Sequence, residues 1–93
     1  MATKIHSSRL LVRQAARMLD TDSVGSTEFC AMAKLYATDA CFEVCNQSLQ
    51  IHGGYGYLKD YPVQQYMRDS RVHQILEGTN EIMKVILAKD LFK

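Results

Sequence analysis

The fold is decided by one long stretch, residues 28–54, which reads EFCAMAKLYATDACFEVCNQSLQIHGG. Its side chains repeat with the period of an α-helix, and we expect a helix over about residues 28–51. One stripe along this helix contains Phe29, Ala33, Tyr36, Ala40, Val44, Gln47 and Ile51. Further apolar residues widen the stripe until little polar face remains, which is typical of a helix buried against several neighbours. Gly53 and Gly54 are expected to end it.

Three further helices are expected around this one, over about residues 3–20, 62–73 and 80–92. Their apolar residues recur every three or four positions, and no alternation typical of a β-strand occurs. Polar, glycine-containing stretches separate them and are expected to be loops. The sequence therefore predicts an all-α protein, a helical bundle in which residues 1–93 form a single domain.

Residues with known preferences for helix ends mark the boundaries. We expect Ser26 or Thr27 to cap the long helix, because short polar side chains accept hydrogen bonds from the first N–H groups of a helix. By the same reasoning, Thr79 or Asn80 is expected to cap the last helix. Pro62 is expected at the first position of the third helix, where its missing N–H does no harm.

Composition excludes several classes of protein. The 93 residues carry a net charge of +1, with 47% hydrophobic and 23% charged residues. This is enough apolar material to exclude disorder, and the balanced charge argues against a nucleic-acid-binding protein. No uncharged apolar run approaches the ~20 residues of a membrane span. A chain this short buries only about 60–65% of its unfolded surface, so either its core is very efficient or a partner covers part of it.

The three cysteines lie in one helical stretch and are expected to act as small hydrophobic side chains rather than as a disulfide framework. They are Cys30, Cys41 and Cys45. A metal site built from Cys41, Cys45 and His52 would lack a fourth ligand and would need a different backbone. No metal site is therefore predicted.

Residues 1–19 allow two interpretations. They contain no acidic residue and four basic ones, which is the composition of a mitochondrial transit peptide; these are Lys4, Arg9, Arg13 and Arg17. They also form a heptad-like stripe, which is typical of a bundle helix; it contains Ile5, Ser8, Val12, Ala15 and Leu19. We favour the bundle helix, because no small-residue cleavage region follows.

Two loops contain candidate functional residues in addition to those that a simple connection between helices requires. The first is Gln50-Ile51-His52-Gly53-Gly54-Tyr55-Gly56-Tyr57, in which glycines would let a ligand approach the backbone. Alone, it is more typical of a helix end packed by tyrosines. The second is Leu76-Glu77-Gly78-Thr79-Asn80-Glu81, where Glu77 is either a general base beside a helix cap or a solvated acid.

The motifs gain specificity when they are taken together and in order. Residues 50–82 contain Gln-x-x-Gly-Gly-x-Gly, Tyr-Pro-Val, Met-Arg-Asp and Gln-Ile-x-Glu-Gly-Thr-x-Glu-Ile. In order and spacing they resemble the C-terminal helical domain of the acyl-CoA dehydrogenases. The resemblance extends back to Ser-Arg-Leu-Leu-Val-Arg-Gln-Ala-Ala at residues 8–16, and so covers essentially the whole chain. Residues 53–79 most resemble family members that act on a short branched acyl-CoA such as isobutyryl-CoA.

The resemblance implies an FAD-dependent oxidoreductase that converts an acyl-CoA to the 2,3-enoyl-CoA. Glu77 matches the carboxylate that removes the proton α to the thioester carbonyl, while the β-hydride passes to FAD. Gly78 matches a residue that lines the thioester. Thr79 and Glu81 match positions that contact the flavin. A further five residues match the segment that reaches FAD, usually that of a neighbouring subunit: Gln50, Ile51, His52, Gly53 and Gly54.

The resemblance also implies partners and a location. The implied partners are electron-transferring flavoprotein and further copies of the same chain, in a dimer or tetramer. The implied location is the mitochondrial matrix in a eukaryote or the cytoplasm in a bacterium. The chain is expected to represent most of the family's C-terminal four-helix bundle without its first helix. Alone, it is expected neither to hold FAD tightly nor to turn over acyl-CoA. The alternative function is a non-catalytic helical module that self-associates through its exposed stripe.

Overall fold

A computed structural model describes residues 1–92, in which five helices and no β-strand occur. The helices are α1 (Ala2–Asp20), α2 (Ser26–His52), α3 (Gly54–Tyr57), α4 (Val63–Val72) and α5 (Asn80–Leu91). The all-α prediction is confirmed, and the four longer helices begin and end within two residues of their expected positions. The single turn α3 lies where the sequence indicated only a loop. None of the helices in residues 1–92 combines the length and the hydropathy that a membrane-spanning helix requires.

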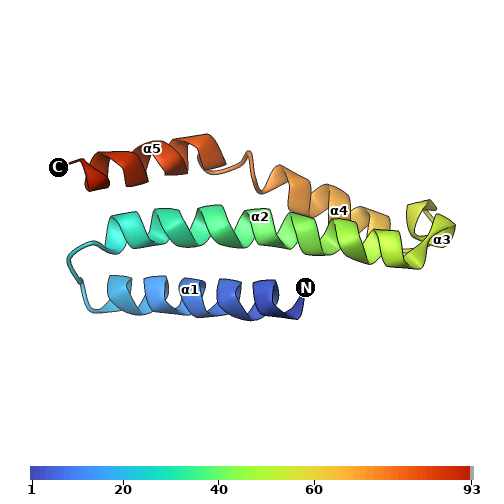
Figure 1. The fold of residues 1–93 in the computed structure, drawn as a ribbon, viewed down its shortest axis with the longest axis horizontal. Coiled ribbons are helices and arrows are strands. Elements are labelled where there is room, and N and C mark those ends of the chain that lie inside the picture. Colours follow the sequence, from blue (N-terminus) through green and yellow to red (C-terminus); the bar gives the residue numbers. More distant parts are fainter. Residues whose placement is uncertain (93) are drawn as a thin grey trace.

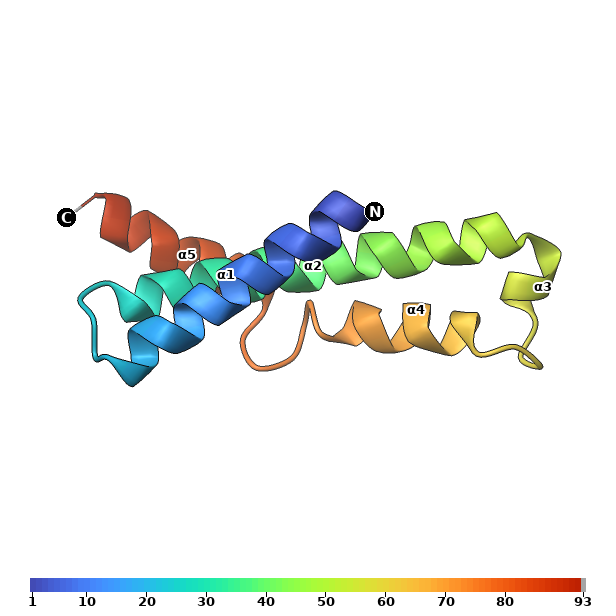
Figure 2. The ribbon, with the colours of Figure 1, turned by 90° about the horizontal axis from the view of Figure 1, so that it is seen from below.

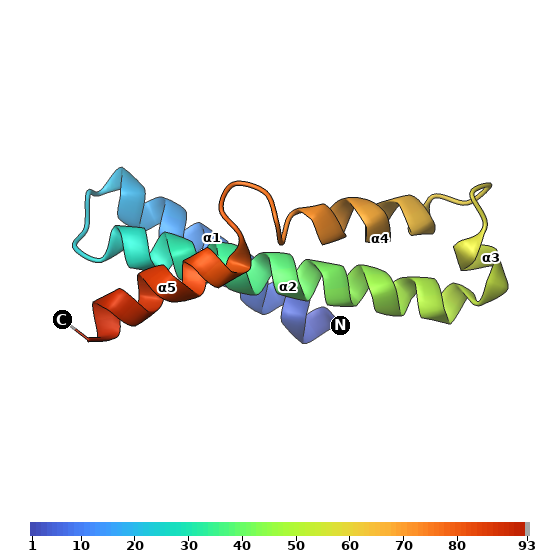
Figure 3. The same ribbon diagram turned by 90° about the horizontal axis from the view of Figure 1, so that it is seen from above.

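Helix α2 is the central element, and the other helices run along it (Figure 1). Helix α1 packs on one side of α2 and α5 on the opposite side (Figure 1), whereas α4 lies beside the C-terminal half of α2, on a different side from α5 (Figures 2 and 3). Among the five helices, α1 and α5 each contact only α2, whereas α4 contacts both α2 and α3. The long apolar stretch that decided the fold is therefore the shared packing surface of the molecule.

The core between these helices is built mainly from alanine. Its buried apolar residues are Ala15, Ala31, Ala33, Ala40 and Val63. Small side chains allow neighbouring helices to approach closely, since the distance between helix axes depends on the side chains at the contact. The stripe predicted for α1 is buried only at Ala15, because no second helix covers the other side of α1.

The molecule is elongated and exposes more surface than its size requires. Its dimensions are 49 × 22 × 18 Å, and its radius of gyration is 15.4 Å, against about 12 Å for a typical domain of this length. Its accessible surface is 6797 Å², about 1,300 Å² more than the area typical of a folded monomer of this mass. Large apolar side chains such as Leu10, Leu19 and Ile51 contribute to this excess.

Helix α1 is tied to α2 by polar contacts as well as by packing. The ammonium group of Lys4 lies 2.8 Å from a carboxylate oxygen of Glu43, and the hydroxyls of Ser7 and Tyr36 form a 2.8 Å hydrogen bond. The hydrogen bond to Glu43 and its negative charge raise the pKa of Lys4 above its ordinary value of 10.5. The interpretation of residues 1–19 as a bundle helix is confirmed by this packing.

The helix ends agree only partly with the sequence. The prediction that Ser26 or Thr27 caps α2 is wrong: Gly25 is the cap, with a φ of 86° that glycine adopts without strain. Gly53, with a φ of 66°, ends α2 as predicted, but Gly54 begins α3. Thr79 caps α5 as predicted, and its hydroxyl accepts a 3.3 Å hydrogen bond from the third residue of the helix.

Candidate functional site

The loop between α4 and α5 holds Glu77 in an unusual conformation. Its φ is +57°, and that of the following Gly78 is +88°. A left-handed backbone is unfavourable for a residue with a Cβ and persists only where surrounding contacts enforce it. Glu77 is exposed, and its amide N–H has no hydrogen-bond acceptor among residues 1–92. The loop therefore presents a carboxylate and a free amide together, just before the first turn of α5.

A cluster of polar side chains fastens this loop to α2. We call it the Asn80 cluster; its members are Lys34, Thr38, Asp39, Gln74 and Asn80. The side-chain amide of Asn80 donates to Asp39 Oδ1 at 2.6 Å and to Thr38 Oγ1 at 2.9 Å. Its carbonyl oxygen accepts from Lys34 Nζ at 2.6 Å. Asn80 is only 4% exposed, so these hydrogen bonds satisfy a buried polar group.

Two further contacts complete the attachment. Lys34 Nζ also donates to the carbonyl of Gly78 at 2.7 Å, and Gln74 Nε2 donates to Asp39 Oδ1 at 2.8 Å. The sequence indicated Asn80 only as a possible helix cap, and it did not predict the cluster. The signal was present: Lys34, Thr38 and Asp39 are polar residues on a helix that is otherwise largely apolar.

The second set of predicted site residues lies at the C-terminal end of α2. Gln50, Ile51, His52, Gly53 and Gly54 are all exposed. His52 is fixed by a 2.7 Å hydrogen bond from its Nδ1 to the carbonyl of Ser48. A Cβ at Gly53 or Gly54 would have no atom within 4 Å, so the backbone is open to a ligand at both positions. This geometry fits a segment that a cofactor approaches from solvent.

The two sets of residues do not meet within one chain. The loop that carries Glu77 is attached to α2 at Lys34–Asp39, whereas the other segment begins at Gln50. Gln50 lies eleven positions after Asp39 in the same helix, which corresponds to about 16 Å along the helix axis. One small group bound at Glu77 would therefore not reach the Gln50–Gly54 segment of the same chain.

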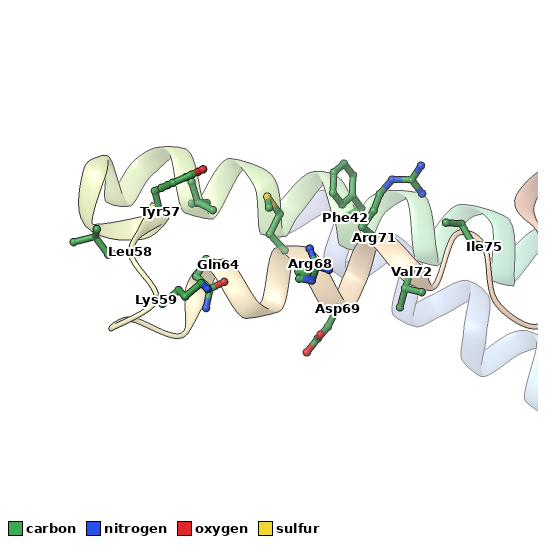
Figure 4. Close-up of a pocket in the computed structure, with 12 residues that line it drawn as sticks. Phe42, Tyr57, Leu58, Lys59, Gln64, Arg68, Asp69, Arg71, Val72 and Ile75 are labelled. Atoms are coloured by element: carbon green, nitrogen blue, oxygen red, sulfur yellow. The ribbon is translucent and has the colours of Figure 1, made fainter.

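A groove of about 970 Å³ between α2, α3 and α4 runs between these two regions. Figure 4 shows Tyr57 and Leu58 at one end and Ile75, at the start of the Glu77 loop, at the other. Phe42 lies in the groove, with the guanidinium of Arg71 6.0 Å from its ring centroid. The groove was not predictable from the sequence, because its residues come from separate helices and from the loops beside them.

The three cysteines differ in how far they are exposed to solvent. All three are free, in agreement with the expectation that they form no disulfide, and Cys41 is exposed whereas Cys30 and Cys45 are half-buried. Partial burial and the neighbouring Cys45 raise the pKa of the Cys41 thiol. Within residues 1–92, no group of three or more histidine, cysteine, aspartate or glutamate residues is placed to hold a metal ion.

Comparison with known proteins identifies the family. Residues 1–92 match the profile of the acyl-CoA dehydrogenase C-terminal domain. The mitochondrial isobutyryl-CoA dehydrogenase of Bos taurus is 57% identical over all 93 residues, which cover 22% of that protein. The caffeyl-CoA reductase-Etf complex subunit CarC of Acetobacterium woodii is 43% identical over 93 residues, which cover 24% of its length.

Solved structures agree with these relatives. The butyryl-CoA dehydrogenase of Megasphaera elsdenii superposes on the whole chain with a TM-score of 0.95 and 36% identity, and the chain covers 24% of it. The chain thus spans between a fifth and a quarter of the length of the relatives it matches. A domain match over the whole described chain, together with this structural agreement, leads to one conclusion: the chain belongs to the acyl-CoA dehydrogenase family.

Proposed function

We propose that residues 1–93 are most of the C-terminal helical bundle of an FAD-dependent enzyme that oxidises a short branched acyl-CoA, such as isobutyryl-CoA, to the 2,3-enoyl-CoA. The observation that carries this proposal is the presentation of Glu77, an exposed carboxylate on a left-handed turn that the Asn80 cluster attaches to the central helix. The 57% identity to the bovine isobutyryl-CoA dehydrogenase supports the substrate class.

In the proposed reaction, the carboxylate of Glu77 removes the proton α to the thioester carbonyl. This proton is weakly acidic, so the oxygen of the developing enolate needs hydrogen-bond donors. The amide N–H of Glu77 has no acceptor among residues 1–92 and is available for that role. Gly78 adds no side chain between this amide and an approaching thioester, so the acyl group can lie against the backbone.

FAD, when bound, would accept the hydride that leaves the β-carbon of the acyl group. The residues proposed to hold it form two groups, Thr79 with Glu81 and Gln50–Gly54. Thr79 and Glu81 lie at the N-terminal end of α5, where the helix dipole favours anionic groups. The open backbone at Gly53 and Gly54 supports close approach of the cofactor.

The separation of these two groups supports an oligomeric enzyme. The Gln50–Gly54 segment begins about 16 Å along α2 from the attachment of the Glu77 loop, and we propose that it meets the FAD of a neighbouring subunit. The excess surface of about 1,300 Å² is larger than the roughly 800 Å² that each partner buries in a standard interface. We therefore propose a dimer or tetramer of the complete enzyme.

Two further assignments follow from the relatives. One relative is a subunit of a caffeyl-CoA reductase-Etf complex, which supports electron-transferring flavoprotein as the partner that receives the electrons. A mitochondrial relative supports the mitochondrial matrix for a eukaryotic source, and a bacterial relative allows the cytoplasm.

A hybrid enzyme tests the proposed reaction. The chain replaces the matching segment of the bovine relative, and the rate of isobutyryl-CoA oxidation is measured with FAD bound. Glu77→Gln should lower kcat about 10²–10⁴-fold, the range typical of a lost general base. Glu43→Gln, which changes an exposed carboxylate on the other contact surface of α2, is the matched control and should keep full activity. An active Glu77→Gln hybrid would refute the assignment.

The chain alone is proposed to bind no FAD tightly and to oxidise no acyl-CoA, because the other three-quarters of the enzyme are required. A purified chain that is yellow and bleaches with isobutyryl-CoA would contradict this. The second candidate function, a self-associating helical module, is favoured by the same exposed apolar surface. Size-exclusion chromatography of the chain alone measures its self-association, and isobutyryl-CoA oxidation by the hybrid enzyme separates the two functions. An active hybrid supports the enzyme, whereas an oligomeric chain whose hybrid is inactive supports the module.

A further inference from the structure

We propose that the Asn80 cluster is a positioning device that holds Glu77 and Gly78 in their left-handed conformation, and that Asn80 is its central positioning residue. The catalytic meaning of this inference rests on the proposed function, but the conformational claim stands on the contacts alone. The cluster joins side chains of the central helix to the loop across 35 to 46 positions of sequence.

The loop has few restraints of its own at Glu77. Backbone hydrogen bonds fix its beginning, where Ile75 and Leu76 donate to Val72, and its end, where Asn80 donates to Gln74. Between these points, no amide from residue 77 to residue 79 donates a hydrogen bond within the described chain. The conformation of Glu77 and Gly78 must therefore be set from outside the loop.

Lys34 supplies the direct restraint. Its ammonium group donates to the carbonyl of Gly78 at 2.7 Å and to the side-chain carbonyl of Asn80 at 2.6 Å. The ammonium group of Lys34 thus links the backbone carbonyl of Gly78 to the side chain of Asn80, the first residue of α5. Rotation of the Glu77–Gly78 backbone out of the left-handed region would carry the Gly78 carbonyl away from Lys34.

Asn80 keeps Lys34 in this position. The side-chain NH₂ group of Asn80 donates its two protons to Asp39 and Thr38. The side-chain oxygen of Asn80 is therefore directed at Lys34, from which it accepts a hydrogen bond. An asparagine offers both donors and an acceptor, whereas aspartate offers acceptors only. Asn80→Asp would place a carboxylate against Asp39 at the 2.6 Å contact, and like charges at such a distance repel strongly. Residue 80 therefore requires an amide.

The conformational claim can be tested in the full 93-residue chain by NMR. A left-handed residue gives a strong intraresidue NOE between its amide proton and its Hα, which Glu77 should show in the wild type. Asn80→Ala should weaken this NOE and raise amide exchange at residues 77–80 at least tenfold, while circular dichroism still reports the helices. Gln65→Ala is the matched control, since its amide donates only to the exposed Asp69 on α4; it should change neither signal.

A second variant covers the case in which Asn80→Ala does not fold. Lys34→Met keeps most of the side-chain length and removes both hydrogen bonds to the loop, and should give the same loss of the Glu77 signature. Retention of that signature in a folded Asn80→Ala or Lys34→Met chain would overturn the proposal. These outcomes do not depend on enzyme activity, so they separate this inference from the proposed reaction.

The catalytic meaning is tested in the hybrid enzyme. A positioning role predicts that Asn80→Ala lowers kcat at least tenfold and changes KM less than twofold, because the base is displaced while the acyl-CoA site remains. An unchanged kcat would contradict the positioning role. An inactive wild-type hybrid, with the Glu77 signature intact in the isolated chain, would instead contradict the proposed function alone.

Discussion

Replacing Gly56 with alanine tests whether the single turn α3 is locked against the end of α2. Gly56 is the buried residue of α3, and a Cβ built there would lie 2.7 Å from the carbonyl oxygen of Leu49 and 2.9 Å from the Cβ of His52. Both atoms belong to α2 close to its backbone, so neither can move aside as the end of a flexible side chain could. The turn would have to shift away from α2.

The expected change in the free energy of unfolding combines two opposing effects. Inserting a methyl group into a closely packed contact is destabilising by about 1–3 kcal/mol. Alanine also restricts the unfolded chain, which stabilises the folded state by roughly 0.4–1 kcal/mol where the backbone permits it. Gly56→Ala should therefore destabilise the protein by about 1–2 kcal/mol, a Tm decrease of roughly 4–16 °C for a domain of this length.

Gly54→Ala provides the matched control within the same turn. A Cβ at Gly54 meets no atom within 4 Å, and its φ lies outside the left-handed region. Alanine there should stabilise the chain by about 0.4–1 kcal/mol. Urea unfolding followed by circular dichroism, at one protein concentration for all chains, measures both variants. Equal stabilities for Gly54→Ala and Gly56→Ala would refute the close contact between α3 and α2.

Three further perturbations have expected outcomes. Thr79→Ala should lower the free energy of unfolding by about 1 kcal/mol in urea unfolding, because the hydroxyl that caps α5 is lost, whereas Thr79→Ser should retain most of it; equal losses would contradict the cap. Cys45→Ala should lower the pKa of Cys41 only partly, because burial is its larger cause; alkylation of Cys41 near neutral pH should become modestly faster, and a slower reaction would contradict this. The raised pKa of Lys4 means that its pairing with Glu43 stabilises the fold below 10.5 and is lost as the pH rises through the raised value. The urea midpoints of wild type and Lys4→Met should therefore differ near neutral pH and converge at high pH; a constant difference would point to packing alone.

The sequence alone determined the helical architecture and the family. Residues 28–51 are apolar on nearly every side, and this local pattern was sufficient to place a central helix within two residues of its ends. Thr79 was recognised as a cap and Gly53 as a helix end because both effects act within one turn of chain. The motifs around Gly53 and Glu77 led to the family for a similar reason: order and spacing are properties of the sequence itself.

The tertiary structure alone decided how the site is held together. The burial of Asn80 depends on Lys34, Thr38 and Asp39, more than 40 residues away in sequence, and no local pattern fixes such a pairing. The separation of Gln50–Gly54 from Glu77 likewise follows from where the α4–α5 loop meets α2. Local propensity determines which residues form helices, but hydrogen bonds between distant residues exist only after the helices pack, and it is those bonds that determine where Glu77 is presented.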